Sequence, residues 1–425
     1  MTLMLFASFT VFMLIGVPIG ISIGSAAILA IYFNTNVPLV VVSQTMFNGI
    51  NNFPLMAIPF FILAGNLMSA GGLSKKLINF ANLFIARYTG GLANVAIGAS
   101  MMFGSISGSA PATTAAIGGV MVKEMEKNGY DKPFTAATVA AAGTVGMVIP
   151  PSIPMVTYCV LAGTSVSTLF LMGIGPGILM GLSMMLVAYM HAKKHNVPKI
   201  NVQLSVGILL RTITDSILAL IMPVMILGGI YGGIFTPTEA GAVAVVYGFI
   251  VGTFIYRDLN FSNLPNVFLD SAIATAVIMM IMATVATFSF VLTRAQIPHM
   301  IATAIINFTS NKYVILFLFN IILLVVGLFL QASPAIALLT PMLLPVMTSV
   351  GISPYMVGII FIVNLSIGQI TPPVGQNLFV ACNISGAPFE GILKAIIPYL
   401  IALLICLLLI TYIEPISMFL VRGRV

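Results

Sequence analysis

Uninterrupted apolar runs limit the fold of this chain more than any other feature of its sequence. Residues Leu400–Ile410, for example, read LIALLICLLLI. Hydrophobic residues make up 60% of the 425 residues and charged residues only 6%, whereas about a quarter of the residues in soluble domains are charged. A chain this apolar is unable to cover itself with polar surface, which excludes a water-soluble enzyme. Continuous runs also exclude a transmembrane β-barrel, whose strands alternate polar and apolar residues.

The chain length sets the number of membrane crossings. At about 20 residues per crossing, there is room for about ten to twelve spans with short loops. The first residues, MTLMLFASFTVFMLIG, lack the basic region and cleavage site of a secretory signal, and we expect them to form the first membrane helix. The net charge of +7 is interpreted as basic residues on cytoplasmic loops, and no nucleic-acid partner is expected. The sequence therefore predicts an all-α polytopic membrane protein.

Two stretches of the chain repeat each other at a distance of 222 residues, one from Asn128 and the other from Val350. The residues that coincide are Gly129 with Gly351, Gly146 with Gly368, Pro150 with Pro372, Pro151 with Pro373 and Pro176 with Pro398. Upstream, one inserted residue aligns APA at 110–112 with SPA at 333–335. Such a set of matched glycines and prolines indicates an internal duplication.

The two copies are predicted to cross the membrane in opposite directions. The loop Lys123–Lys132 carries three lysines, and its repeat partner Val346–Tyr355 carries none. Because cytoplasmic loops are enriched in Lys and Arg, the first loop should face the cytoplasm and the second the outside. This is the pattern of an inverted repeat.

Each copy contains two segments that are unsuited to a plain spanning helix. The first is GSISGSAPA at Gly104–Ala112 and LFLQASPA at Leu328–Ala335, where we expect the tips of two re-entrant helical hairpins. The second holds adjacent prolines, at Gly146–Ser152 and Gly368–Gly375. Prolines remove backbone donors and disfavour helix at the preceding residue, so each of these two helices should be broken into halves.

Broken backbone at membrane depth is tolerated only where it is buried in protein or lines a wet cavity. Its carbonyl and hydroxyl oxygens are ligands that small hard cations prefer, and half-helix N-termini suit a carboxylate. Two hairpin tips facing two broken helices therefore predict two similar cation sites with space for an anionic solute between them. The alternative is that these segments are only kinks, since Gly and Pro are common in membrane helices.

Ionisable side chains are absent from these broken segments. Proton-coupled carriers usually place Asp, Glu or His within their spans, so coupling through a buried carboxylate is not expected. Glu239 follows Pro237 and Thr238, and we expect it to cap the start of a helix.

The hairpin, the paired proline elements and a glycine-rich segment at Gly228–Gly248 resemble a known family. GGIYGGIFTPTEAGAVAVVYG at Gly228–Gly248, the hairpin GSISGSAPATTAAIG, and the paired elements IPPS and TPPVGQN are similar to the large membrane subunit of tripartite ATP-independent periplasmic (TRAP) transporters. The similarity covers essentially the whole chain, and within the family the resemblance suggests the sialic-acid (SiaM-type) subunits. C4-dicarboxylate and other sugar-acid members share these motifs.

The resemblance implies a sodium-driven importer of an organic acid, here sialic acid, in the bacterial inner membrane. It implies two protein partners, a periplasmic substrate-binding protein and a small four-helix membrane subunit, which is expected as a separate chain. It also implies an elevator mechanism, in which a transport domain slides against a scaffold in the lipid bilayer. Sodium is the expected coupling ion, with two or more ions per cycle, and no organic cofactor is expected.

Domain boundaries follow from the resemblance and the repeat. The expected parts are 1–89 (scaffold and first arm, Gly72–Arg87), 90–190 (first transport repeat), 191–311 (cytoplasmic loop, scaffold and second arm, Thr293–Asn311), 312–400 (second transport repeat) and 401–425 (end of the last helix).

Site residues are carried over from the family one by one. The first sodium site is expected at Ser107 with the carbonyls of Gly146, Val148 and Pro151. The 222-residue offset then proposes Gly368, Ile370 and Pro373 for a second sodium site, facing Gln331 and Ala332, although the serine that would match Ser107 is missing. The expected solute ligands are Ser109, Ser152, Gln376 and Asn377. For each of these, the alternative is that the side chain satisfies local backbone groups.

An energetic argument favours sodium coupling. Moving one net positive charge inward is worth about 2.3 kcal/mol per 100 mV, so two sodium ions with one monocarboxylate are helped by the membrane potential. The chain has no G-x-x-x-x-G-K-[ST] phosphate-binding loop for ATP. The alternatives are a stand-alone sodium/dicarboxylate symporter, an ion channel and, last, an intramembrane enzyme, because the serines of the broken segments lack an evident base.

Overall fold

The computed structural model describes residues 1–197, 206–309 and 311–421. Residues 198–205 and 310 of the expected range 191–311, and residues 422–425 of the range 401–425, lie outside this part. Within the described part the regular elements are all helical. The first half contains α1 (Thr2–Leu14), α2 (Ile19–Asn34), α3 (Val40–Ile50), η1 (Phe53–Met56), α4 (Ala57–Ala70), α5 (Leu73–Ile85), α6 (Gly91–Ser107), α7 (Ala110–Lys127), α8 (Lys132–Thr144), η2 (Val145–Met147), α9 (Ile153–Ala162) and α10 (Val166–Lys194).

The second half repeats this order. It contains α11 (Val206–Tyr231), α12 (Pro237–Ile250), η3 (Val251–Ile255), α13 (Leu264–Arg294), α14 (Ile297–Phe308), α15 (Lys312–Phe329), α16 (Ala332–Ser349), α17 (Pro354–Gly368), α18 (Gln376–Ser385), α19 (Phe389–Tyr412) and α20 (Pro415–Met418). Across the described residues, eight helices are long and apolar enough to span a membrane, and five more are apolar but shorter. The predicted all-α polytopic class is confirmed.

The duplication extends well upstream of the stretch that the sequence revealed. The segment α3–η1–α4 runs from Val40 to Ala70 and matches α13, Leu264–Arg294, at an offset of 224 residues. The arms match too, since α5 and α14 begin at the same offset. Each arm follows a residue with positive φ, Gly72 at 75° and Gln296 at 55°. This conformation is uncommon for glutamine, so its recurrence marks the same sharp turn in both halves.

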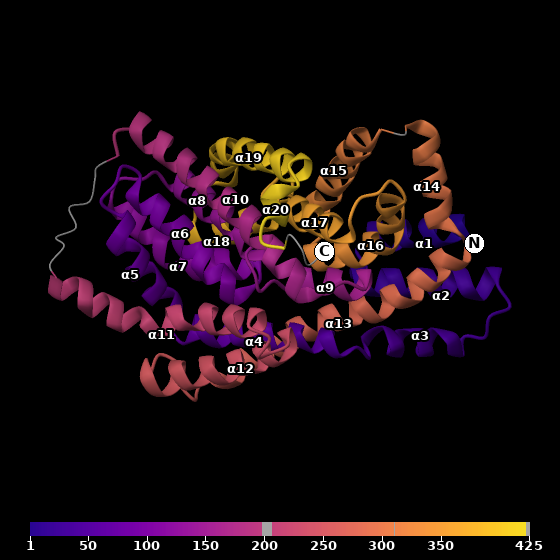
Figure 1. Cartoon of the computed structure of the whole chain (residues 1–425), viewed down its shortest axis with the longest axis horizontal. Coiled ribbons are helices and arrows are strands. Elements are labelled where there is room, and N and C mark those ends of the chain that lie inside the picture. Colours follow the sequence, from indigo (N-terminus) through magenta and orange to yellow (C-terminus); the bar gives the residue numbers. More distant parts are fainter. Residues whose placement is uncertain (198–205, 310, 422–425) are drawn as a thin grey trace.

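The two predicted hairpins are present. In the first, α6 and α7 are joined by Gly108 and Ser109, and Gly108 ends α6 in the left-handed conformation at φ 60°. In the second, α15 and α16 are joined by Leu330 and Gln331 without a positive φ. Figure 1 shows the first hairpin to the left and the second to the right, so they approach the middle of the molecule from opposite ends, as an inverted repeat requires.

Both proline-containing helices are broken as predicted. The first stops after η2 and resumes at α9, and the second stops at Gly368 and resumes at α18. In the second break the backbone N–H of Asn377 donates to the carbonyl of Gln369 at 3.0 Å, which ties the two halves together. The broken segments therefore keep part of their hydrogen bonding inside the protein, as membrane burial demands.

A glycine contact joins each hairpin to its broken helix. A Cβ atom on Gly104 of α6 would lie 2.7 Å from Cα of Gly146, and one on Gly368 would lie 2.7 Å from Cα of Gly327 in α15. Real Cβ atoms do not approach this closely, so Gly104 and Gly368 must remain glycine for the two backbones to touch. Gly104 corresponds to Gly327 in the repeat, and Gly146 corresponds to Gly368. These two offsets differ by one residue, which is the single insertion seen in the sequence.

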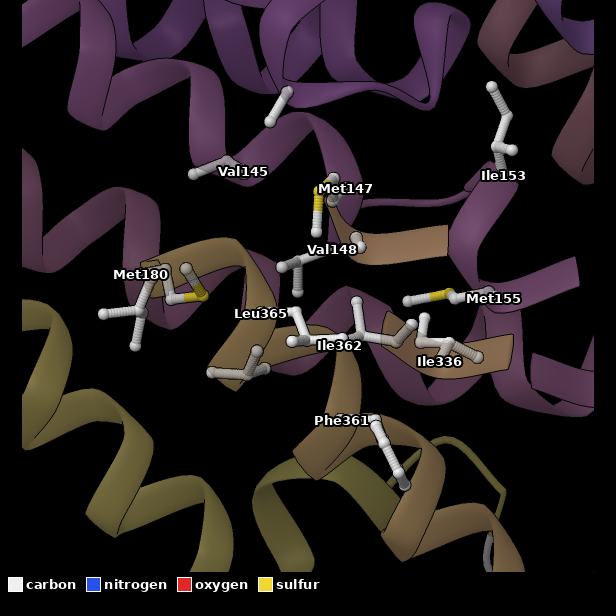
Figure 2. Close-up of a cluster of buried hydrophobic side chains, with 14 of the residues drawn as sticks. Val145, Met147, Val148, Ile153, Met155, Met180, Ile336, Phe361, Ile362 and Leu365 are labelled. Atoms are coloured by element: carbon white, nitrogen blue, oxygen red, sulfur yellow. The ribbon is translucent and has the colours of Figure 1, made fainter. Parts of the chain in front are cut away.

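The buried hydrophobic cluster extends through both halves of the chain and includes the region where they meet. Figure 2 shows Met147 and Val148 of the first broken segment beside Ile362 and Leu365 of α17. All four side chains are almost completely buried. Helices α4 and α13 flank this core: α4 packs against α6 and α9, and α13 packs against α16. The hairpins therefore contact α4 and α13, and the assignment of α4 and α13 to a static scaffold stays a prediction.

Two local expectations have plain outcomes. Glu239 forms a capping box with Thr236 at the start of α12: its carboxylate accepts from the Thr236 N–H at 2.8 Å, and its own N–H donates to the Thr236 hydroxyl. The capping interpretation is confirmed. The range 401–425 was expected to be the end of the last helix. The long helix α19 instead ends at Tyr412, and a separate short helix, α20, begins at Pro415, a residue suited to a helix start.

We predict that Gly368→Ala lowers the stability of the protein by about 1–3 kcal/mol, because the added methyl group overlaps the backbone of Gly327. Gly119→Ala is the matched control, since Gly119 is an exposed helical glycine with nothing within 4 Å of its Cβ position. This control should be neutral or slightly stabilising. Apparent melting temperatures of the purified proteins in detergent measure both. Equal melting of Gly368→Ala and the wild type would contradict the glycine contact.

Candidate functional site

A cavity of about 410 Å³ lies between the hairpin tips, the broken helices, α4 and α13. Residues from both halves of the chain line it, and none of these lining residues is charged. They are Ile62, Gly65, Asn66, Ser107, Gly108, Ser109, Pro111, Ala112, Met147, Ile153, Pro154, Ala274, Val277, Ile278, Ile281, Gln331, Ala332, Ser333, Pro334, Gln369 and Gln376.

Four helices begin at this cavity. Ser109 precedes α7, Ile153 begins α9, Gln331 precedes α16 and Gln376 begins α18, and all four residues line the cavity. The first turn of a helix has N–H groups without intrahelical partners and carries partial positive charge. Four such ends around an uncharged cavity favour an anion and offer it neutral donors.

The opposite wall of the cavity is mostly apolar. From α13 it receives only apolar side chains, and from α4 it receives Ile62, Gly65 and Asn66. The Asn66 amide donates to the Ser271 hydroxyl at 2.9 Å, within the same wall. A Cβ atom on Gly65 would lie 3.1 Å from Cα of Ser107, so α4 approaches the first hairpin tip closely. Polar groups of the cavity are therefore concentrated on the hairpins and broken helices.

Three of the four residues expected at the first sodium site surround the first hairpin tip. Ser107 is buried, and its hydroxyl oxygen lies 2.8 Å from that of Thr113, which in turn donates to the Ser109 carbonyl at 2.8 Å. The Thr113 hydroxyl sits where a Cβ of Gly146 would be. A Cβ on Gly108 would lie 2.9 Å from the Pro151 carbonyl oxygen. Hydroxyl and carbonyl oxygens thus gather at this tip.

The fourth residue, Val148, lies further round the broken segment. Its carbonyl oxygen faces Gly173 of α10, close to where a Cβ of that glycine would be. The first-site residues are thus brought together at the tip with this one exception.

Residues expected at the second sodium site are more dispersed. Gln331 and Ala332 line the cavity at the start of α16, while Gly368 lies against Gly327 behind it. Ile370 is fully buried and Pro373 is exposed, and neither lines the cavity. The second tip therefore brings only part of this set to the cavity.

The expected solute ligands divide into two pairs. Ser109 and Gln376 line the cavity. Ser152 is fully buried at the start of α9, where its hydroxyl accepts from the Met155 N–H and donates to the Met147 carbonyl. Asn377 is fully buried as well, and its amide donates to the Ala140 carbonyl at 3.3 Å. Ser152 and Asn377 thus bond to local or neighbouring backbone groups.

Thr113, Gln369 and Asn66 were not identified from the sequence. Thr113 follows Ser109 by one helical turn, and that spacing places its hydroxyl back at the tip. Gln369 lies 222 residues after Met147, and the Gln369 amide nitrogen lies 3.1 Å from the Met147 sulfur. A polar residue within a predicted span was the available signal for Gln369 and Asn66.

Comparison with known proteins places the chain in a family. The model of the DctM component of tripartite ATP-independent periplasmic transporters matches residues 6–416. The isethionate TRAP transporter permease protein DctMQ of Oleidesulfovibrio alaskensis is 43% identical over 98% of this chain, which spans 65% of that relative. The C4-dicarboxylate large permease DctM of Pseudomonas aeruginosa is 42% identical over 88% of this chain and 87% of its own length.

Two further similarities are informative. The sialic acid large permease SiaM of Vibrio cholerae is 35% identical over 93% of this chain and 92% of its own length. Among solved structures, the YdaH transporter of Alcanivorax borkumensis shares the fold at a TM-score of 0.62, with 15% identity, over 91% of this chain and 89% of that one. Together with its membrane helices, these matches show that the chain is a multi-pass inner-membrane protein of the DctM family, the large permease component of TRAP transporters.

Proposed function

We propose that this chain imports a small organic anion together with sodium ions, using a periplasmic binding protein and a small membrane subunit as partners. The observation that carries the proposal is the convergence of four helix N-termini on an uncharged cavity. Such a cavity binds an anion through backbone N–H groups and hydroxyls, without the desolvation of a buried cationic side chain.

Coupling to cations follows from the direction of transport. An anion that moves inward works against the membrane potential by about 2.3 kcal/mol per 100 mV and per charge. With two sodium ions per monovalent anion, one net positive charge moves inward, so the membrane potential then favours import. The broken segments offer uncharged oxygens, which suit sodium. They hold no carboxylate of the kind that proton-coupled carriers use to bind a proton.

The first hairpin tip supplies the better cation site. In our proposal, the Ser107 and Thr113 hydroxyls, 2.8 Å apart, bind the ion together with the Gly146 and Pro151 carbonyls of the adjoining broken segment. A side chain on Gly146 would occupy the position of the Thr113 hydroxyl, so the glycine leaves room for that hydroxyl at the tip. At the second tip, Gln331 and the Gly368 carbonyl are the corresponding groups in our proposal.

An elevator movement is supported by the asymmetric position of the cavity. On α4 the lining residues lie within Ile62–Asn66, which correspond through the 224-residue offset to 286–290 of α13. On α13 itself the cavity reaches Ala274–Ile281 instead. The mismatch is about ten residues, or about 15 Å of helix. The hairpins therefore sit off the centre of a repeated frame, as expected of a unit that moves between two positions.

The named relatives, rather than the residues that line the cavity, suggest which acids to test first. The sequence resemblance suggested sialic acid, whereas the isethionate and C4-dicarboxylate relatives are more similar to this chain than the sialic acid relative is. We therefore propose a small hydrophilic acid, with isethionate and C4-dicarboxylates as the first compounds to test and sialic acid after them.

Uptake into proteoliposomes tests the proposal. The chain is reconstituted with its small subunit and binding protein, and sodium and potential gradients are imposed separately on labelled acids of the panel. We expect uptake that requires sodium and all three proteins and that increases with an inside-negative potential. Uptake without the binding protein would instead show a stand-alone symporter. Ion currents far above the turnover of a carrier would show a channel. Uptake that does not depend on sodium would refute the coupling.

Thr113→Val should raise the sodium concentration for half-maximal uptake about tenfold, because it removes one hydroxyl from the oxygen set at the first tip. Thr113→Ser should restore it. Thr135→Val is the matched control, since Thr135 is equally buried in α8 but its hydroxyl has no hydrogen-bond partner within the described structure. An unchanged sodium dependence in Thr113→Val would remove Thr113 from the site.

A further inference from the structure

Gln369 is a buried amide at the cavity wall whose hydrogen-bonding groups are poorly matched. It directly follows α17, lines the cavity and is only 4% exposed. Its amide nitrogen donates to the Met147 sulfur at 3.1 Å, and a thioether is a weak acceptor. Its amide oxygen is buried and has no donor among the residues that the structure describes. A buried polar side-chain atom without a partner is costly, and among the residues that line this cavity only Gln369 carries one in the described structure.

The repeat sharpens this observation. Three glutamines line the cavity, Gln331, Gln369 and Gln376, and all come from the second half. With the single insertion taken into account, the matching first-half residues are Gly108, Met147 and Pro154. At these three positions the first half presents a glycine, a thioether and a proline ring to the cavity, and the second half presents three long amides. The two halves share a backbone arrangement but differ in what they offer to a solute.

A packing role alone does not explain an amide at this position. Met147 occupies the equivalent place in the first half and is itself almost fully buried at the cavity wall. An unbranched apolar side chain thus fits this backbone environment, and it carries no unmatched polar atom. The amide oxygen of Gln369 adds hydrogen-bonding capacity that the described part of the fold does not use.

We propose that Gln369 determines specificity by accepting a hydrogen bond from a hydroxyl or N–H group of the transported acid. This rests on the proposed function of the cavity. The unmatched atom is an acceptor, and an ionised carboxylate or sulfonate has no hydrogen to donate to it. The anionic group is held by the helix N-termini, and a second, donating group on the solute meets Gln369. The terminal torsion of a glutamine is soft, so a rotation of the amide away from Met147 brings its oxygen to the cavity.

The substrate class that follows is an organic acid with a hydroxyl or N–H group, rather than a plain alkyl acid. The test compares the acid that the wild type imports with its analogue lacking that group, for instance isethionate with ethanesulfonate or malate with succinate. Each pair has the same charge, so the membrane potential and the sodium requirement act equally on both members. The KM of the wild type should be at least about tenfold lower for the hydroxylated member.

Gln369→Met is the decisive variant, because it reproduces the residue of the other repeat. We expect it to raise the KM for the hydroxylated acid until the two members of a pair are transported alike. The sodium concentration for half-maximal uptake and the melting temperature should stay as in the wild type. Gln44→Met makes the same chemical change on the exposed surface of α3 and should keep the wild-type preference.

The outcomes separate this inference from the proposed function. A wild type without sodium-dependent uptake would refute the proposed function and the assignment of Gln369 with it. Sodium-dependent uptake with no preference for the hydroxylated member, or an imported acid without any donor group, would overturn the Gln369 inference alone. A Gln369→Met protein that keeps the wild-type preference would do the same.

Discussion

The fold depends on one constraint, that interrupted backbone at membrane depth must find its partners inside the protein. Two helices are broken near the middle of the molecule, and each is covered by a hairpin that touches it glycine to glycine, Gly104 with Gly146 and Gly327 with Gly368. These contacts bring four helix N-termini to one cavity. The electrostatic character of the site is therefore a property of the backbone and needs no charged side chain.

The two halves use this shared backbone differently. At the first tip, Ser107 and Thr113 place hydroxyls beside the Gly146 backbone, which suits a small cation. In the second half, Gln331 and Gln369 bring amides with longer reach. Duplication supplied two equivalent backbone frames with different side chains. In our proposal, the first frame provides the better cation site, and the second adds the amide that recognises the solute.

The sequence predicted what is encoded locally. Adjacent prolines and small polar tips fixed the broken helices and hairpins, and their spacing revealed the repeat. The direction of individual side chains was not predictable in this way, because it depends on how distant segments approach. Ser152 and Asn377 turn toward backbone groups, whereas Gln369 reaches the cavity wall. The apolar wall from α13 gave no local signal, since any face of such a helix looks alike in the sequence.

The most direct test is an experimental structure of the transporter with sodium and its transported acid bound. We expect the anionic group of the acid in the cavity among the starts of α7, α9, α16 and α18, with backbone N–H groups and uncharged side chains as its partners. An anionic group paired with a lysine or arginine, or bound outside this cavity, would contradict it.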